Sequence, residues 1–369
     1  MMGGGARAAY QVGVLQGIAE FTKKGAPSPF NIISGISAGA INAAALASAA
    51  HNYHRAVHRL ATVWGNFHCD QIFYSDWPGI TKTGAKWLLG MMLANFGKDK
   101  AMCLLDRVPL HELLSNYLHT TGIQRNIDKG ILHAVSVTAS GYMSGQNVTF
   151  FQGDKSISSW KRARRIGCRE PINVDLLMAS SAIPFIFEPV KVNREYFGDG
   201  SIRLIAPLSA PLHLGAEKIL VMGNRMEKEK IPDRIQQIAP PNFAQVAAHV
   251  LNSIFLDSLE ADLERLERIN NTIDKIPEHV LTEGGLNLRK VETLHIAPSE
   301  DIGKIAEPYT RDMPVPLRLL LRGIGALKKE SSTLVSYLLF EKSYCRELMS
   351  LGFEDALAMK NELKDFLQL

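Results

Sequence analysis

The pentapeptide GISAG, residues 35–39, joins a short apolar run at residues 30–33 to an alanine-rich stretch at residues 38–50. The apolar run predicts a buried strand, and the alanine-rich stretch predicts a helix because alanine has the highest helix propensity. A tight strand-to-helix turn of the form G-x-S-x-G lifts its serine out of the sheet. The following helix directs its positive end at Ser37. The pentapeptide therefore predicts a serine elbow, with an ordinary glycine-rich turn as the alternative.

A second glycine-rich turn, GGGAR at residues 3–7, precedes another helical pattern over residues 8–24. Backbone N–H groups at the start of a helix bind anions, and here no side chains obstruct them. Either a phosphate cradle or an oxyanion hole fits this arrangement. The dinucleotide pattern G-x-G-x-x-G fails at Ala8, and neither a suitably placed acidic residue nor a Gly-Lys-Ser/Thr motif is present. The oxyanion hole is therefore the favoured interpretation.

This second turn should follow a strand, yet only Met1 and Met2 precede it. Two residues are too few for a strand of typical length. We therefore expect the loop at residues 3–7 to lack its anchor on one side.

Strands and helices alternate over residues 1–225, which is typical of an α/β protein with parallel strands. We predict a three-layer α/β/α sandwich with a mostly parallel central sheet, formed by a domain of residues 1–225. Residues 226–369 are mostly helical, with one strand expected at residues 291–296. They predict a helix-rich C-terminal extension packed on the first domain.

Composition limits the classes of protein that this chain can represent. Of its 369 residues 46% are hydrophobic and its mean hydropathy is near zero, which argues against multiple membrane spans. The 41 basic and 37 acidic residues give a net charge of +4, too small to predict nucleic-acid binding. Four cysteines without metal-type spacing fit a reducing compartment. Since no signal peptide is visible, we expect a cytoplasmic protein, with attachment to the inner membrane face left open.

A third motif is the Asp199-Gly200 pair, which follows a short expected strand at residues 196–197. Taken alone, an Asp-Gly pair after a strand predicts a turn. Its significance depends on the two glycine-rich turns that precede it in the chain.

In this order, the three motifs resemble those of the patatin-like phospholipase family in its bacterial form. That family has a G-G-G-x-[RK] loop, a G-x-S-x-G elbow and a distant D-G-[GA], which correspond here to residues 3–7, 35–39 and 199–201. The stretch ASSAIP at residues 179–184 looks like the family's A-S-x-A-x-P. The resemblance covers residues 3–225, with Ala8 in place of a frequent glycine and Ser201 in place of Gly or Ala.

The resemblance implies a serine acyl hydrolase of phospholipase A or lysophospholipase type that uses neither metal nor cofactor. In such an enzyme Ser37 attacks acyl esters of lipids through an acyl-enzyme, and Asp199 accepts its proton without a histidine. The other implied site residues are Gly3, Gly4, Gly5, Ala6 and Arg7 in the oxyanion loop, Gly35 and Gly39 in the elbow, and Gly200 and Ser201 beside Asp199.

Three alternatives stay open. The same dyad would serve a thioesterase that acts on acyl-CoA or an acyl carrier protein, and a non-catalytic membrane-associated scaffold could retain the fold. A Ser-Asp-His triad is the rival catalytic arrangement, but Ser37 stands too early in the chain for the α/β-hydrolase fold. The histidines that follow Asp199 and could complete such a triad are His213, His249, His279 and His295.

Other patterns bear on the expected partners, which are a lipid or acyl-ester substrate, with a peripheral membrane surface left open. Residues 87–93 form an apolar stretch flanked by lysines, which predicts either a core helix or an interfacial helix. Residues 161–165 form a basic loop. His51, His54 and His58 share one helix face, for which we expect a solvated or half-buried surface rather than a metal site. The oligomeric state is left open.

Overall fold

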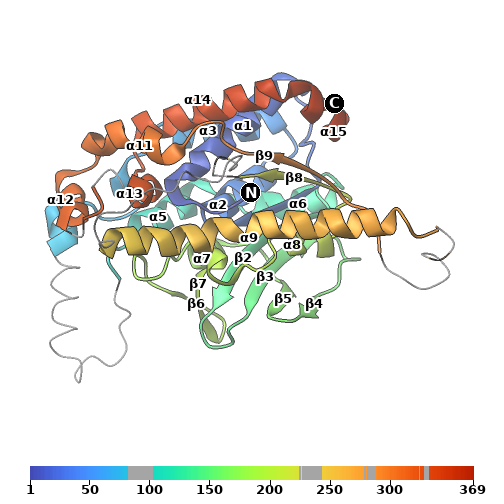
Figure 1. Ribbon diagram of the computed structural model, residues 1–369, viewed down its shortest axis with the longest axis horizontal. Helices are drawn as coiled ribbons and strands as arrows, with labels where there is room; N and C mark the ends of the chain where they lie inside the picture. The colour runs from blue at the N-terminus through green and yellow to red at the C-terminus, as the bar shows by residue number, and fades with distance from the viewer. Residues whose placement is uncertain are drawn as a thin grey trace, which may run out of the picture.

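The computed structural model describes residues 1–81, 103–223, 243–277, 288–323 and 332–369, together with residues 226, 280 and 325–327. The described strands form a seven-stranded sheet and a separate two-stranded sheet (Figure 1). The strands of the larger sheet are β1 Ile32–Ile36, β2 Ala134–Gly141, β3 Asn147–Gly153, β4 Trp160–Arg162, β5 Arg165–Arg169, β6 Val190–Val192 and β7 Glu195–Asp199, and the pair consists of β8 Lys218–Met222 and β9 Glu292–Ile296.

Helices pack against these sheets, whereas β3, β4 and β5 lie at the lower edge of the view (Figure 1). Those of the first 225 residues are η1 Gly5–Ala8, α1 Ala9–Glu20, α2 Ala38–Ser48, α3 Tyr53–Trp64, η2 Cys69–Gln71, α5 Val108–Tyr117, α6 Thr121–Asp128, α7 Val174–Ser180, η3 Gly200–Arg203 and α8 Ser209–His213, where η marks a 3₁₀ helix. The later ones are α9 Phe243–Ile273, α11 Ile302–Tyr309, η4 Thr310–Asp312, α12 Val315–Gly323, α13 Ser332–Leu338, α14 Lys342–Ala358 and α15 Lys360–Leu367.

The larger sheet is mixed, so the predicted mostly parallel sheet is wrong. Its strand order is β4-β5-β3-β2-β7-β6, with β1 beside β2. Only the β1–β2 and β3–β5 pairs are parallel, whereas β2–β3, β2–β7, β4–β5 and β6–β7 are antiparallel. The reason is connection length: residues 142–146 join β2 to β3, and so short a link permits only antiparallel neighbours.

Apolar side chains of β1 reach two cores on opposite faces of the sheet. Ile33 belongs to the main core, which also contains the buried faces of α1, α2 and α14. Ile36 belongs to a second core with Leu208, Leu259 and Val291, from the regions of α8, α9 and β9. Successive residues of a strand face opposite sides, so this part of the sheet has helices on both faces.

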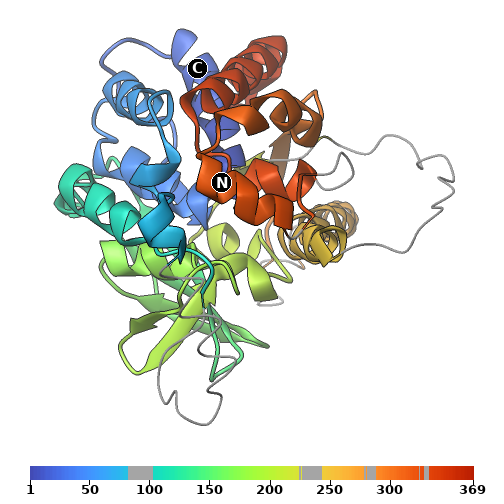
Figure 2. The same ribbon diagram turned by 90° about the vertical axis from the view of Figure 1, so that its left-hand side faces the viewer.

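The predicted extension shares both a sheet and a core with the predicted first domain. The expected strand near residues 291–296 is confirmed as β9, which pairs in parallel with β8. Helix α14 packs along α1, and a side chain at Gly13 or Gly352 would overlap the backbone of the other helix. Figure 2 shows the C-terminal helix α14 alongside the N-terminal helices. The domain boundary at residue 225 stays a prediction.

Met1 and Met2 lie between β1 and β8. The Met1 amino group donates to Ser34 O at 2.9 Å, and Met1 O accepts from Ile36 N at 3.2 Å, which is the pattern of a parallel bridge. Met2 N donates to Met222 O at 3.3 Å. Beyond Met1, a cavity of about 600 Å³ continues between β1 and β8. The two residues thus link β1 to β8 at one end of this cavity.

Among the helices that the structure describes, none combines the length and the apolar character that a bilayer-spanning segment needs. The apolar stretch at residues 87–93 lies outside the described residues. The basic residues 161–165 form a hairpin of β4 and β5 rather than the predicted loop, with Arg164 in its turn.

Candidate active site

The carboxyl ends of two strands meet on one edge of β2. Strand β1 runs parallel to β2 and ends where Ile36 pairs with Thr138. Strand β7 approaches antiparallel along the same edge and ends where Asp199 pairs with Ala139, the next residue of β2. Ser37 directly follows β1. Residues separated by 162 positions in the sequence are therefore brought to adjacent places by the sheet.

Ser37 forms a strained turn between β1 and α2. Its φ of 55° and ψ of −131° lie outside the regions that serine ordinarily occupies, and such strain costs about 1–3 kcal/mol. The Ser37 N–H donates to Ser180 Oγ at 2.9 Å, and the Ser180 hydroxyl donates to Thr138 O at 2.7 Å. Ser180 belongs to the ASSAIP stretch. That stretch therefore fastens the elbow to β2.

The glycines of the elbow permit close packing on both sides. A side chain on Gly35 would lie 2.4 Å from the carbonyl oxygen of Gly39. A side chain on Gly39 would lie 2.5 Å from Met2 O. Gly39 is thus the position where the elbow touches the two residues that precede the glycine-rich loop.

Asp199 is fully buried beside the elbow. Its Oδ1 accepts the Ser201 N–H at 2.9 Å, and its own N–H donates to Ala182 O at 2.8 Å. Its Oδ2 makes no hydrogen bond of acceptable geometry to any described residue. Burial raises the pKa of Asp199 to about 6, a rise that the nearby Ser37 hydroxyl, the Ser201 donors and Arg107 partly counteract. The carboxylate thus has one satisfied oxygen and one unpaired oxygen.

The glycine-rich loop lies directly against both residues. A side chain on Gly3 would lie 2.8 Å from Ser37 Cβ and 3.0 Å from Ser201 Oγ. The N–H groups of Gly4, Gly5 and Ala6 are the first of η1 and therefore lack intrahelical acceptors. They also have no acceptor elsewhere among the described residues. The loop thus brings unpaired backbone donors to the elbow.

The C-terminal region holds this loop in place. Gly5 has a φ of +55°, and a side chain there would lie 2.2 Å from Tyr337 O of α13. The buried Arg7 donates through Nε to Ser336 Oγ at 2.8 Å and stacks 4.2 Å over the Tyr337 ring. Sequence reasoning missed these partners, because nothing in residues 332–338 marks them as neighbours of a loop more than 300 residues away.

Arg107 is a second buried residue that sequence reasoning missed. Its guanidinium donates to Met178 O at 3.0 Å, to Ser181 Oγ at 3.1 Å and to Glu188 O at 3.0 Å. Burial lowers the pKa of Arg107 to about 10, against the opposing effect of Asp199. The arginine therefore stays charged and fixes the segment that follows α7. A polar residue at the start of an expected helix gives no signal of this role.

The histidines of the rival triad lie in other surroundings. The His213 ring stacks on Trp160 at 4.9 Å and its Nδ1 bonds to Ser209 O at 2.7 Å. His249 is an exposed residue of α9, and His295 lies in β9 beside β8. His279 is outside the described residues. Outside the sheet, the hydrogen-bond partners that the structure gives Ser37 and Asp199 are Ala40, Ser180, Ala182 and Ser201, none of which is a histidine.

The three histidines near α3 show no metal-binding arrangement. His51 and His58 are exposed and His54 is half-buried. Within the described part of the chain, no group of three or more His, Cys, Asp or Glu side chains could hold a metal ion.

An apolar cavity of about 230 Å³ begins at Ser37 and Gly5. It extends between α2, α3 and α5, and its walls are mostly aliphatic and aromatic. The central wall residues are Ile41, Ala45, Leu60, Val63, Trp64, Leu110, Leu114 and Phe340. The serine thus stands at the end of a space that is suited to a hydrocarbon chain.

Comparison with family models identifies the family of this chain. The family model for patatin-like phospholipases matches residues 1–212, more than half of the chain. The chain therefore belongs to the patatin-like phospholipase family. The crystal structure of VipD from Legionella pneumophila matches with 12% identity and a TM-score of 0.33, over 91% of this chain and 65% of VipD. The chain thus spans about two thirds of that protein. No curated protein matches.

Proposed function

We propose that the protein hydrolyses acyl esters of lipids with Ser37 as nucleophile and Asp199 as its general base. The observation that carries this proposal is the meeting of the two residues on one edge of β2, with a buried carboxylate oxygen that has no other partner. A base needs a free lone pair within reach of the proton that it accepts. The unpaired Oδ2 meets this need for the Ser37 hydroxyl.

In the first half of the reaction, Asp199 takes the Ser37 proton while Oγ attacks the carbonyl carbon of the ester. The carbonyl oxygen becomes an oxyanion, and the N–H groups of Gly4, Gly5 and Ala6 stabilise it. The tetrahedral intermediate then collapses, the bond to the leaving alcohol breaks, and Asp199 returns its proton to that alcohol. An acyl-enzyme ester on Ser37 remains.

In the second half, Asp199 takes a proton from water, whose oxygen attacks the acyl-enzyme carbonyl. The same N–H groups stabilise the second oxyanion. Collapse releases the fatty acid, and the Asp199 proton returns to Ser37 Oγ. The raised pKa of Asp199, about 6, supports this role, because the carboxylate is ionised at neutral pH and more basic than an ordinary aspartate.

The substrate class is inferred from the family and from the cavity. Apolar walls next to Ser37 favour an acyl chain over a polar substrate. A thioester of the same acyl chain would contact the same donors and the same base. Thioesterase activity is therefore one of the outcomes that the test below distinguishes. A membrane surface as second partner, and a cytoplasmic location, remain predictions.

The test is a hydrolysis panel that contains phospholipids, lysophospholipids, soluble esters and acyl thioesters of one chain length. We expect turnover of oxygen esters that is lost in Ser37→Ala. Turnover of thioesters alone would indicate the thioesterase. No turnover of any substrate by a folded protein would indicate the non-catalytic scaffold and would contradict the proposal.

A further inference from the structure

We propose that the apolar cavity beside α2 is a tunnel that measures acyl-chain length, with room for about twelve carbons. This inference rests on the proposed function, because it places the acyl carbonyl at Ser37. It goes further in naming the chain that fits and the residues that set the limit.

One face of α2 forms the floor of the tunnel. Ser37, Ile41, Ala45 and Ser48 all line the cavity and recur every three or four residues, which places them in one row along the helix. The last three are partly exposed, whereas nearly all other residues of α2 are buried. The small side chains of Ala45 and Ser48 leave space above the helix. The row starts at the nucleophile and continues to the far end of α2.

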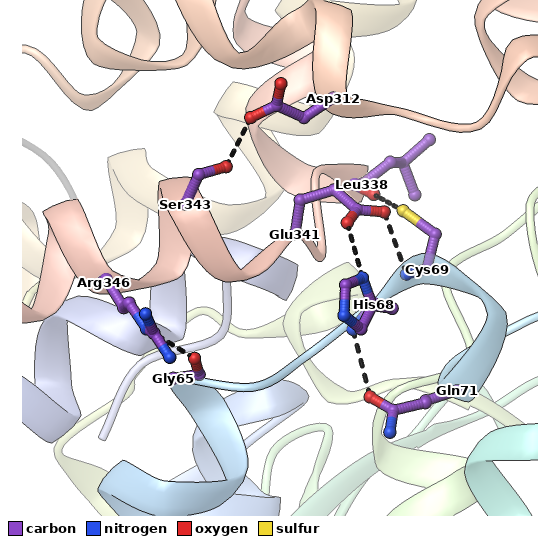
Figure 3. A network of polar contacts seen from close by, with 9 residues as sticks. All are labelled: Gly65, His68, Cys69, Gln71, Asp312, Leu338, Glu341, Ser343 and Arg346. Atoms are coloured by element: carbon purple, nitrogen blue, oxygen red, sulfur yellow. Dashed lines mark hydrogen bonds and ion pairs between the residues drawn. The ribbon is translucent and has the colours of Figure 1, made fainter.

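The opposite wall is held rigidly near the nucleophile. Phe340 stacks with Trp64 at 6.2 Å between ring centroids and meets Phe67 at the same separation. The next residue, Glu341, is buried and accepts from Cys69 N at 3.2 Å and pairs with His68 Nδ1 at 3.0 Å (Figure 3). This network fixes the aromatic wall, so the tunnel cannot widen freely around a bulkier chain.

The far end of the tunnel is polar and basic. The lining residues there include His51, Arg59, His119 and Arg125, all of which are exposed. No ion pair among the described residues involves any of them, and the described cavity lining contains no aspartate or glutamate. A methylene group gains nothing among hydrated polar side chains, and displacing their water is costly. The basic rim therefore ends the apolar path.

The helix provides the scale of the tunnel. From Ser37 to Ser48 the backbone rises by about 16 Å, at about 1.5 Å per residue. With carbon–carbon bonds of about 1.5 Å in a zigzag, this length holds roughly twelve carbons. Ala45 lies about 12 Å along the path, which corresponds to roughly nine carbons.

The first experiment measures kcat/KM for a series of p-nitrophenyl esters with four to eighteen acyl carbons. We expect kcat/KM to rise by at most about fourfold per methylene up to about twelve carbons and then to level off. A bulky side chain in mid-tunnel, Ala45→Trp, should lower the ratio of dodecanoyl to butyryl turnover at least tenfold. The matched control is Arg55→Trp on the exposed face of α3, which does not line the cavity.

A rim variant moves the limit the other way. Arg59→Leu extends the apolar path by one side chain, so the preferred chain should lengthen by about two to four carbons. Arg55→Leu, on the same helix, is its control. If folded Ala45→Trp protein keeps the chain-length profile of the unmodified protein, the tunnel assignment is wrong. Ala45→Leu repeats the test should the tryptophan prevent folding.

A binding experiment separates the tunnel from the chemistry. Alkyl methyl ketones carry the carbonyl but cannot be hydrolysed, so calorimetry with 2-tetradecanone and 2-hexanone reports chain binding alone. We expect Ala45→Trp to weaken the binding of 2-tetradecanone at least tenfold more than the binding of 2-hexanone. Ketone binding of this kind in a protein that turns over no ester would overturn the proposed function and support the tunnel. Equal affinity for 2-tetradecanone in the unmodified protein and in Ala45→Trp would overturn the tunnel.

Discussion

The two glycine-rich turns of this protein carry similar sequences but are held in opposite ways. The elbow at Ser37 follows a complete strand, β1, and is fastened from within the sheet through Ser180 and Thr138. The loop at residues 3–7 is held through Met1 and Met2, which bond to β1 and β8, and on its other side by α13.

This difference shows that the predicted extension, residues 226–369, contributes contacts to the site. Tyr337 O leaves no room for a side chain on Gly5, and Ser336 accepts from Arg7. The family model ends at residue 212, so these supports lie outside the part of the chain that the model matches. The contacts of the elbow thus lie within the matched part of the chain, whereas the glycine-rich loop also depends on residues beyond it.

The largest expected effect on kcat comes from replacing the serine of the elbow or its neighbour Asp199. Ser37→Ala and Asp199→Asn should each lower kcat by about 10⁴-fold or more, by analogy with other serine hydrolases. Because the two residues act as one unit, the double variant should be no worse than either single variant. Replacing His213, His249 or His295 should leave turnover of a soluble ester largely intact. A folded His295→Ala protein as inactive as Ser37→Ala, with an active Asp199→Asn protein, would support the triad instead.

The next effect concerns the loop side. Gly5→Ala should lower kcat by about 10²-fold or more, because a side chain at φ +55° meets Tyr337 O and displaces the oxyanion donors. Its matched control is Gly25→Ala, which has a φ of +79° but nothing within 4 Å of the added carbon. The control should lose only about 1 kcal/mol of stability and keep its kcat. Equal kcat values for the two variants would show that the loop does not depend on its outer contact.

The pH dependence of kcat/KM tests the role of Asp199. Asp199 acts as a base only when ionised, and its pKa is raised to about 6. The value of kcat/KM should therefore be constant above about pH 7 and fall about tenfold per unit below pH 6. An ordinary aspartate would keep its activity down to about pH 4. A soluble ester assayed from pH 4.5 to 8.5 distinguishes the two profiles, provided that circular dichroism shows folded protein throughout.

A smaller effect tests the outer support of the loop. Ser336→Ala leaves the buried Arg7 guanidinium without this acceptor, which should cost about 1–3 kcal/mol of unfolding free energy. We expect kcat to fall several-fold, since the loop keeps its contact with Tyr337. Ser343→Ala is the control, because that hydroxyl bonds to Asp312, away from the loop. Urea denaturation of both variants, with parallel assays, gives the comparison.

Local patterns were sufficient to predict much of the helical framework. The predicted helices near residues 8–24 and 38–50 are confirmed as α1 and α2. Helical periodicity and alanine content act over a few residues, so a single sequence contains them. The glycine-rich turns, too, stand where the motifs placed them.

Strand direction was predicted wrongly. Strand direction depends on which strands become neighbours, and this is not a local property of the sequence. One local signal was present: Gly145, with φ +63° in the short link between β2 and β3, is typical of a hairpin. The supports from Arg107, Ser336 and Tyr337 could not be predicted, because each depends on a contact between distant parts of the chain.

The central claim is that Asp199 activates Ser37, and covalent labelling tests it most directly. A fluorophosphonate probe reacts with an activated serine, and peptide mass spectrometry locates the modified residue. The account predicts a single label on Ser37, formed at least 100-fold more slowly in folded Asp199→Asn protein. A label on another serine, or equally fast labelling of Ser37 in Asp199→Asn, would contradict it.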